Sequence, residues 1–271
     1  MSRCLLWIVA IVAIVSLPTP WIRGESSLSQ SHAERSMIRV SPISDTFATQ
    51  MELAARSVPS HVWYAVMDAG WRVYLAEQVV DAVPALRGVA PRGWPAGTLW
   101  DNTDAVHLPA SKQLVVAEKR RNRRGEVVSC TRVAGVLRHE LGHAFDMVAG
   151  QDGHFRSASA DFLAAYHGDV AEMTAVRREK LQYYLQPQDA GRQETFAEAF
   201  GIVLGGGSDP DHREVFTTGF TRSLKLVRDA IGEHGAPRPS VATADSRHVP
   251  VPSAATPSEF RASGPLLRRW R

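Results

Sequence analysis

The chain has 271 residues, of which 44% are hydrophobic and 22% are charged, and this composition excludes collagen-like, coiled-coil and wholly disordered proteins. Only two cysteines are present, Cys4 and Cys130, which excludes a disulfide scaffold or a cysteine-based zinc site. The formal net charge is +3. Residues 1–24 contain Arg3 and Arg23 but no acid, so the remainder has 29 basic and 28 acidic residues, a balance that gives no indication of nucleic-acid binding.

The N-terminal segment has the pattern of a secretory signal. Arg3 precedes an apolar run from Leu5 to Leu17, and Pro18 and Pro20 interrupt the chain soon afterwards. The run is too short to predict a membrane span, whereas a positive start, a short apolar stretch and a polar exit are typical of a signal peptide. We therefore predict a signal peptide over residues 1–24 and a secreted or periplasmic mature protein with no membrane span. An uncleaved anchor is the alternative.

Composition divides the rest of the chain into three parts. Residues 25–44 are rich in serine and other polar residues, which predicts a flexible linker. Residues 236–271 contain six prolines among serine, alanine and threonine, which predicts a disordered tail. Residues 45–235 remain as one domain of ordinary size.

The first half of this domain mixes predicted strands with helices. Asp45 is a candidate N-cap for a helix that reaches about Arg56. A strand at 71–75 is predicted from the alternation of apolar and polar residues, and helical spacing follows at 79–86. Further strands are predicted around a Gly/Pro-rich loop and a basic turn, at 106–108, 114–117 and 127–128. The strand 114–117 is either a sheet edge that could pair with a peptide or an interior strand.

The second half of the domain is predicted to be helical. Thr131 is a candidate N-cap for a helix from Arg132 to Ala149 that ends at Gly150. Helical stretches follow at 160–185, for which Gly168 is a candidate break, and then at 192–204 and 210–233. Strands followed by helices predict an α+β domain.

Residues 139–143 read His-Glu-Leu-Gly-His, which is the pattern H-E-x-x-H in the middle of a predicted helix. Residues four apart differ by only about 40° around a helix, so the rings of His139 and His143 can face one point. Two neutral imidazoles supply half of a tetrahedral zinc shell. Glu140 is turned about 100° from His139 and can instead take the proton of a zinc-activated water.

A catalytic zinc needs a third protein ligand. The longer pattern H-E-x-x-H-x-x-G-x-x-H does not supply it, because Asp146 and Ala149 occupy its glycine and last histidine positions. Glu194 and Glu198 lie four apart on one face of a predicted helix, beside two phenylalanines. Buried carboxylates are costly unless paired or bound to a metal, so one could bind zinc while the other orients a ligand histidine. The alternative is a solvated helix face with two acids.

The segment 139–146, His-Glu-Leu-Gly-His-Ala-Phe-Asp, is followed some fifty residues later by 194–200, Glu-Thr-Phe-Ala-Glu-Ala-Phe. Together they resemble the catalytic domain of anthrax lethal factor and the related secreted Pro-Pro endopeptidases. The sequences at 92–95 and 99–101 are similar to a tryptophan-containing segment of the latter. The resemblance covers roughly residues 70–232. It implies a zincin-like metallopeptidase domain of α+β class that holds one zinc ion and acts on a protein or peptide substrate.

The resemblance also implies a role for each residue of the second motif. Glu194 matches the third zinc ligand, and Glu198 matches a carboxylate behind the metal. The family places a tyrosine ahead of this motif to stabilise the oxyanion. Tyr183 and Tyr184 are the candidates and Tyr184 is preferred, although the spacing to Glu194 is a few residues longer than the family pattern.

The function expected from these residues is that of a secreted zinc metalloendopeptidase with Glu140 as the general base. Two other functions are compatible with the same sequence. One is a zinc hydrolase of cell-wall peptides, and the other is a secreted binding or toxin-accessory protein that keeps the fold but has no turnover. Metal content together with cleavage of an unstructured protein distinguishes the three.

Overall fold

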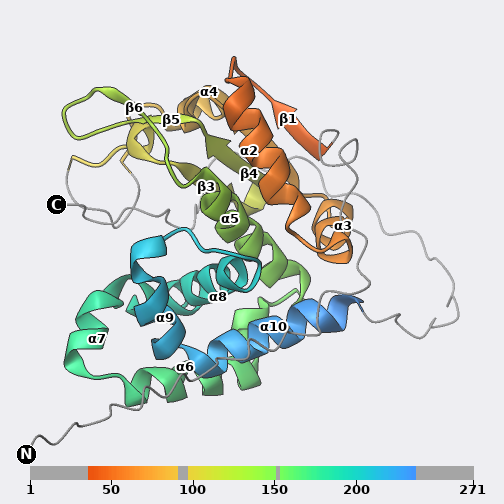
Figure 1. Ribbon diagram of the computed structural model, residues 1–271, viewed down its shortest axis with the longest axis vertical. Coiled ribbons are helices and arrows are strands. Elements are labelled where there is room, and N and C mark those ends of the chain that lie inside the picture. Colours follow the sequence, from red (N-terminus) through yellow and green to blue (C-terminus); the bar gives the residue numbers. More distant parts are fainter. Residues whose placement is uncertain (1–35, 91–96, 151–152, 236–271) are drawn as a thin grey trace, which may run out of the picture.

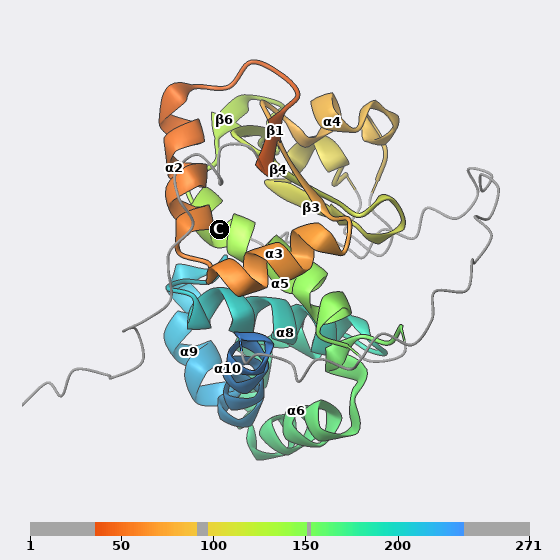
Figure 2. The ribbon, with the colours of Figure 1, turned by 90° about the vertical axis from the view of Figure 1, so that its right-hand side faces the viewer.

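A four-stranded sheet and a layer of helices lie on opposite sides of one long helix, α5 (Val133–Val148), in the computed structural model (Figure 1). The structure describes residues 36–90, 97–150 and 153–235. Figure 2 shows α5 between the sheet above and helices α6, α8, α9 and α10 below. The predicted signal peptide, the predicted C-terminal tail and Trp94 lie outside the described residues. None of the helices in the described ranges is both long enough and apolar enough to cross a membrane.

The main sheet is mixed and has the strand order β1-β2-β4-β3. Strands β1, β2 and β4 are parallel, and β3 is antiparallel to β4. The strand predicted at 114–117 is therefore interior, and β3 forms the edge nearest to it. The bounds of these strands are β1 Met37–Arg39, β2 Arg72–Ala76, β3 Ala105–Leu108 and β4 Gln113–Ala117.

A separate hairpin connects the sheet to α5. Strand β5 (Lys119–Arg121) pairs with β6 (Val127–Ser129) in antiparallel register. The basic segment that was predicted as a turn thus begins as a strand, and only its second half turns. In Figure 1 the hairpin projects from the sheet side of the molecule.

The last residues of the predicted linker 25–44 belong to the folded domain. Met37 pairs with Val73 as part of β1, so the folded domain begins before residue 45. The helix predicted to start at Asp45 is confirmed as α2 (Asp45–Arg56), but the capping side chain is that of Ser44, whose Oγ accepts the Phe47 N–H at 3.1 Å. Ser44 has extended backbone, which is the usual conformation of an N-cap.

The remaining helices agree with the predicted regions but differ in their breaks. The stretch 160–185 divides at Met173, because the hydroxyl of Thr174 caps a new helix, while Gly168 stays helical. The stretch 210–233 divides at Phe220. Helix α5 begins at Val133 without a side-chain cap from Thr131. The bounds are α3 Ser60–Asp68, α4 Val79–Ala82, α6 Ala160–Glu172, α7 Ala175–Lys180, α8 Ala190–Val203, α9 Arg213–Gly219 and α10 Thr221–Gly235.

Both faces of the sheet are covered, and the larger core lies on the α5 side. Along β4, Leu114 and Val116 face the cluster that includes α2, α3, α5, α8 and α10, whereas Val115 and Ala117 face a smaller cluster with α4. This alternation is the two-residue period of a strand. Helix α5 is consequently enclosed by apolar groups on two sides, which places the polar groups on its buried faces in a site of low dielectric constant.

Candidate metal centre

Helices α5 and α8 approach each other closely at a glycine in the H-E-x-x-H segment. A Cβ on Gly142 would lie 2.7 Å from Ala197 Cα and 2.8 Å from Ala197 O, so any side chain there would force the helices apart. Because Gly142 is one residue before His143 and Ala197 is three after Glu194, the close approach brings the two motifs together. The absence of a side chain at Gly142 is thus a condition for the site.

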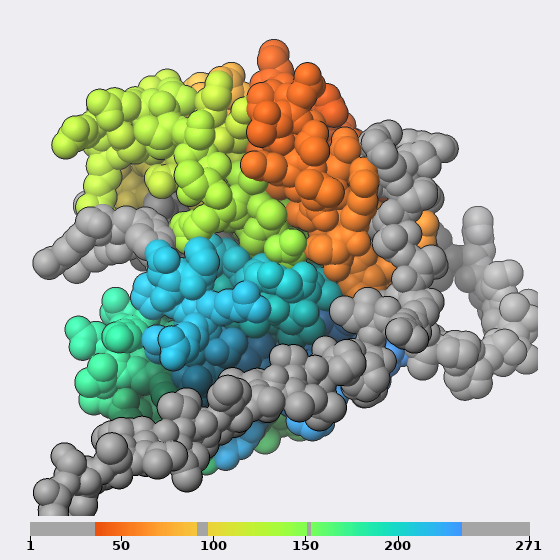
Figure 3. Space-filling model, viewed as in Figure 1, coloured from red at the N-terminus to blue at the C-terminus, as the bar shows by residue number. Residues whose placement is uncertain are grey.

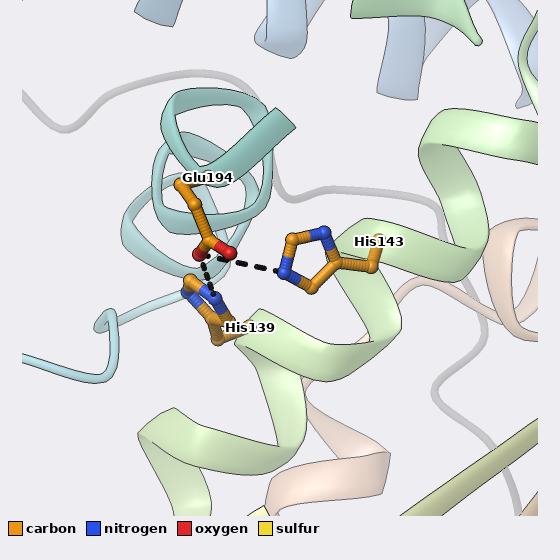
Figure 4. A group of neighbouring side chains, drawn as sticks. All are labelled: His139, His143 and Glu194. Atoms are coloured by element: carbon orange, nitrogen blue, oxygen red, sulfur yellow. Dashed lines mark hydrogen bonds and ion pairs between the residues drawn. The ribbon is translucent and has the colours of Figure 1, made fainter. Parts of the chain in front are cut away.

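Three predicted ligands converge between these helices. The Nε2 atoms of His139 and His143 lie 3.1 Å and 3.5 Å from the same carboxylate oxygen, Oε2 of Glu194. Figure 4 shows the two rings from α5 and the carboxylate from α8 pointing toward one another. The three side chains are buried, and their ligand atoms lie within 4.8 Å of one another. Burial and convergence together are typical of a metal centre rather than of a solvated acid face.

The donor set fits a zinc ion in kind and in spacing. Zinc in proteins takes imidazole nitrogen and carboxylate oxygen at about 2.0–2.2 Å, and two ligands of one tetrahedral ion are then roughly 3.3 Å apart. The contacts of 3.1 Å and 3.5 Å from Glu194 to the two histidines bracket that value. Three protein ligands are also the usual number at a catalytic zinc, which keeps its fourth position for water or substrate.

Glu198 holds one of the ligand rings from behind. Its Oε2 lies 3.0 Å from His139 Nδ1 and also accepts hydrogen bonds from the backbone N–H and the hydroxyl of Ser208, at 3.1 Å and 2.6 Å. Gly207 lets the loop backbone reach this carboxylate, because a Cβ there would overlap Glu198 Oε1. A hydrogen bond of this kind fixes the tautomer and the plane of a metal-binding histidine.

The carboxylates dominate the electrostatics of the ligands. Burial alone would lower the pKa of His139, but hydrogen bonds with Glu194 and Glu198 outweigh it and raise the pKa to about 10. Burial would raise the pKa of Glu194, but the charge of His143 and hydrogen bonds with both histidines lower it to about 2. The two carboxylates therefore favour a positive charge on the His139 ring.

Glu140 lies on α5 between the two histidines and is 3% exposed. Burial raises its pKa above the ordinary value, and the nearby histidines oppose that shift only in part. A carboxylate whose pKa is moved toward neutrality is better suited to exchange protons than an exposed one. The predicted general base is thus placed beside the ligand group, in an environment that suits the role.

The two candidate tyrosines have different surroundings. Tyr184 is fully buried and packs its ring against Phe216 and Phe220. The Tyr183 hydroxyl is buried and makes no hydrogen bond of standard geometry to the described residues. Burial first, and then the negative charge of Glu194, raise the Tyr183 pKa well above its ordinary value. Tyr183, the candidate that was not preferred, thus lies close to Glu194 of the candidate metal centre.

Two more polar residues lie near the site. The sequence left Asp146 between a role behind the metal and that of a surface acid near a helix end, and it gave no indication of His107. Asp146 is fully buried and accepts hydrogen bonds from the N–H and hydroxyl of Ser157, both at 2.6 Å. Burial outweighs these bonds and raises the Asp146 pKa to about 7. His107 on β3 is 3% exposed and stacks on His143 with ring centroids 5.1 Å apart. A single histidine among apolar strand residues gives no local signal of such a contact, because the contact depends on how β3 packs on α5.

Trp100, which the sequence offered as part of a tryptophan-containing segment, has a core position. It belongs to the smaller apolar cluster with Val106, Leu108 and Val115. This cluster lies on the face of the sheet that is turned away from α5. The Trp100 ring therefore packs against the sheet on the side opposite to the candidate metal centre.

Comparison with known proteins identifies the fold. No protein-family model matches the chain, and no curated protein matches it. Among solved structures, the chain is similar to the Pro-Pro endopeptidase from Paenibacillus alvei, with a TM-score of 0.51 and 17% sequence identity. The match covers 73% of this chain and 98% of that one. The α+β class predicted from the sequence is confirmed, and the fold is related to that of this peptidase.

Proposed function

We propose that the chain is a zinc-dependent metalloendopeptidase. The observation that carries the proposal is the convergence of His139, His143 and Glu194 on one buried point. The structural likeness to a Pro-Pro endopeptidase supports the same class of reaction. The finer assignment to the lethal factor group rests on the sequence resemblance of the two motifs, which lie on separate helices.

Each residue of the site has a separate task in the proposed reaction. A zinc ion held by His139, His143 and Glu194 would supply a Lewis acid that makes water more acidic. Glu140 takes the proton of the attacking water and passes it to the leaving amine. The Tyr183 hydroxyl donates a hydrogen bond to the oxyanion of the tetrahedral intermediate, and Glu198 keeps His139 in orientation.

The sheet offers a place for an extended peptide. β3 is the edge strand beside α5, and it is bonded to β4 on one side. Peptidases commonly bind an extended substrate by strand addition to such an edge. An extended substrate would therefore lie on the β3 side of the sheet and not beside 114–117, which is an interior strand.

Secretion belongs to the same proposal and is supported by the sequence of residues 1–24. A zinc peptidase with a cleaved signal would meet its substrates outside the cytoplasm. Mass spectrometry of the N-terminus of the protein recovered from the growth medium tests this part separately. A chain that stays in the cells with Met1 to Gly24 intact would contradict it.

The experiment that tests the activity uses the purified chain and a diverse peptide mixture, with the cut sites found by mass spectrometry. We expect cleavage that a chelator abolishes and added zinc restores. Glu140→Gln should bind zinc in full but cut at least 10²-fold more slowly. Zinc binding without cleavage of any peptide would favour the non-catalytic binding protein, and cleavage of cell-wall peptides alone would favour the wall hydrolase. A chain that binds no zinc would refute the proposal.

A further inference from the structure

His107 lies in the middle of the edge strand and faces the metal centre. It pairs with Leu114 across the sheet, and its neighbours Val106 and Leu108 belong to the cluster on the opposite face. Because successive side chains of a strand point to opposite faces, the His107 ring is directed to the α5 side. There it is 3% exposed.

Three rings form a stack at this point, which we call the ring column: Trp71, His107 and His143. The His107 and Trp71 rings have centroids 4.9 Å apart and planes 18° apart. The His107 and His143 rings have centroids 5.1 Å apart and planes 20° apart. Trp71 is 1% exposed and belongs to the main core, so the column connects a ligand ring to the fixed interior.

His107 is held by these ring contacts. Both of its ring nitrogens are buried, and neither has a hydrogen-bond partner in the described part of the chain. His107 is also in a poor position to act as a ligand of the same ion as His143. A nitrogen lone pair lies in the plane of its ring, and the planes of the two stacked rings are nearly parallel.

The two ligand histidines are supported in different ways. His139 is held by the hydrogen bond from its Nδ1 to Glu198. For His143, the only polar contact among the described residues is the one between its Nε2 and Glu194, on the metal side. The ring column is therefore what supports the face of His143, in place of a hydrogen bond to Nδ1.

We propose that His107 is a positioning residue, which sets the plane of the His143 ring by stacking it on Trp71. This inference rests on the metal site of the proposed function. Loss of the groups that orient a ligand histidine commonly lowers metal affinity 10–100-fold. Because the support is a flat ring and not a hydrogen bond, a phenylalanine at position 107 should preserve the metal affinity and a leucine should lower it.

The test compares His107→Phe with His107→Leu in the full chain after removal of metal. Affinity for Zn²⁺ is measured by competition with a chromophoric chelator, and the visible bands of bound Co²⁺ report the ligand geometry. We expect the Zn²⁺ affinity of His107→Phe to lie within about 3-fold of that of the wild-type chain. This variant should also melt at a higher temperature, because the substitution removes two unpaired buried nitrogens. His107→Leu should bind 10–100-fold more weakly and alter the Co²⁺ spectrum. His154→Leu, at an exposed position, is the matched control and should change neither.

Three outcomes would overturn the inference. The first is unchanged affinity and spectrum in His107→Leu, and the second is equal weakening by His107→Phe, which would mean that the nitrogens matter. The third is that the wild-type chain binds neither Zn²⁺ nor Co²⁺. That result would refute the metal site itself and is distinct from the other two.

If His107→Leu does not fold, His107→Met takes its place, because an unbranched side chain fills irregular space more readily.

Discussion

Glu198 Oε2 and His139 Nδ1 lie 3.0 Å apart, and the same oxygen accepts two hydrogen bonds from Ser208. One buried carboxylate thus orients a candidate metal ligand and fixes the loop after α8. The two effects can be measured separately, since one concerns metal affinity and the other concerns folding.

We expect Glu198→Ala to lower zinc affinity about 10–100-fold, because His139 loses the partner that orients it. The free energy of unfolding of the metal-free chain should also fall by about 1–3 kcal/mol, because the Ser208 donors lose their acceptor. Chelator competition and denaturant unfolding measure the two quantities. Glu179→Ala, at an exposed position on α7, is the control. A Glu198→Ala chain with unchanged zinc affinity would contradict the role in orientation.

Gly142→Ala should destabilise the chain by about 1–3 kcal/mol, because the new methyl group overlaps the backbone at Ala197. Zinc affinity should fall as well, since Glu194 lies on the helix that is pushed away. Gly232→Ala on α10 is a matched control, for which we expect a change in stability of the opposite sign. No atom lies within 4 Å of its new Cβ, so it should stabilise by about 0.5–1 kcal/mol. Urea unfolding midpoints decide, and equal shifts in both variants would disprove the packing argument.

Tyr183→Phe should lower kcat by about 10²–10³ with little change in KM, because the hydroxyl would act only on the oxyanion. Tyr184→Phe should keep kcat near that of the unchanged chain, since its ring packs with Phe216 and Phe220. Steady-state kinetics on a peptide found in the cleavage experiment provides the test. The reverse pattern would restore the preference for Tyr184 that the sequence alone suggested.

The metal-free chain should lose stability as the pH rises above neutrality. The pKa of His139 in the folded chain is raised to about 10, above about 6.5 in an unfolded chain. Its contribution is therefore fully present below about pH 6.5 and is lost as the pH rises toward 10. With chelator present, the Tm should fall between pH 7 and 9.5. Saturating zinc should raise the Tm at pH 9, because the ion binds deprotonated ligands.

His139→Gln gives the control for the pH effect, because it removes the titrating ring. Its metal-free Tm should depend less on pH over the same range. A rise in the Tm of the metal-free unchanged chain from pH 7 to 9.5 would contradict the assignment. A slope that is the same in His139→Gln would assign the effect to other groups.

Local periodicity was sufficient to predict the helices that supply the ligands. His139 and His143 lie four residues apart on one helix face, and Glu194 and Glu198 do the same on another helix. The sequence therefore predicted correctly how the two members of each pair lie relative to each other. The contact between the pairs depends on packing over fifty residues of chain. The resemblance to known peptidases indicated it, and the close approach at Gly142 now gives its physical basis.

Other features could not be predicted because they depend on distant partners. β1 is a three-residue strand in a polar segment, and its pairing with β2 defines it. The break after α6 is made by the Thr174 cap, while Gly168 remains helical. The contact of His107 with His143 arises only when the edge strand packs on α5.

Three buried carboxylates in the helical half each accept both the N–H and the hydroxyl of one serine: Asp146 with Ser157, Asp169 with Ser223, and Glu198 with Ser208. The glycine-rich stretch 205–207 is therefore tethered at its end, although its composition suggests an easy target for digestion. Within the folded domain, a protease added to the native chain should cut the exposed tip of the β5–β6 hairpin before it cuts this stretch. The connection that looks weakest in the sequence is thus held by the same carboxylate that orients His139 in the candidate metal centre.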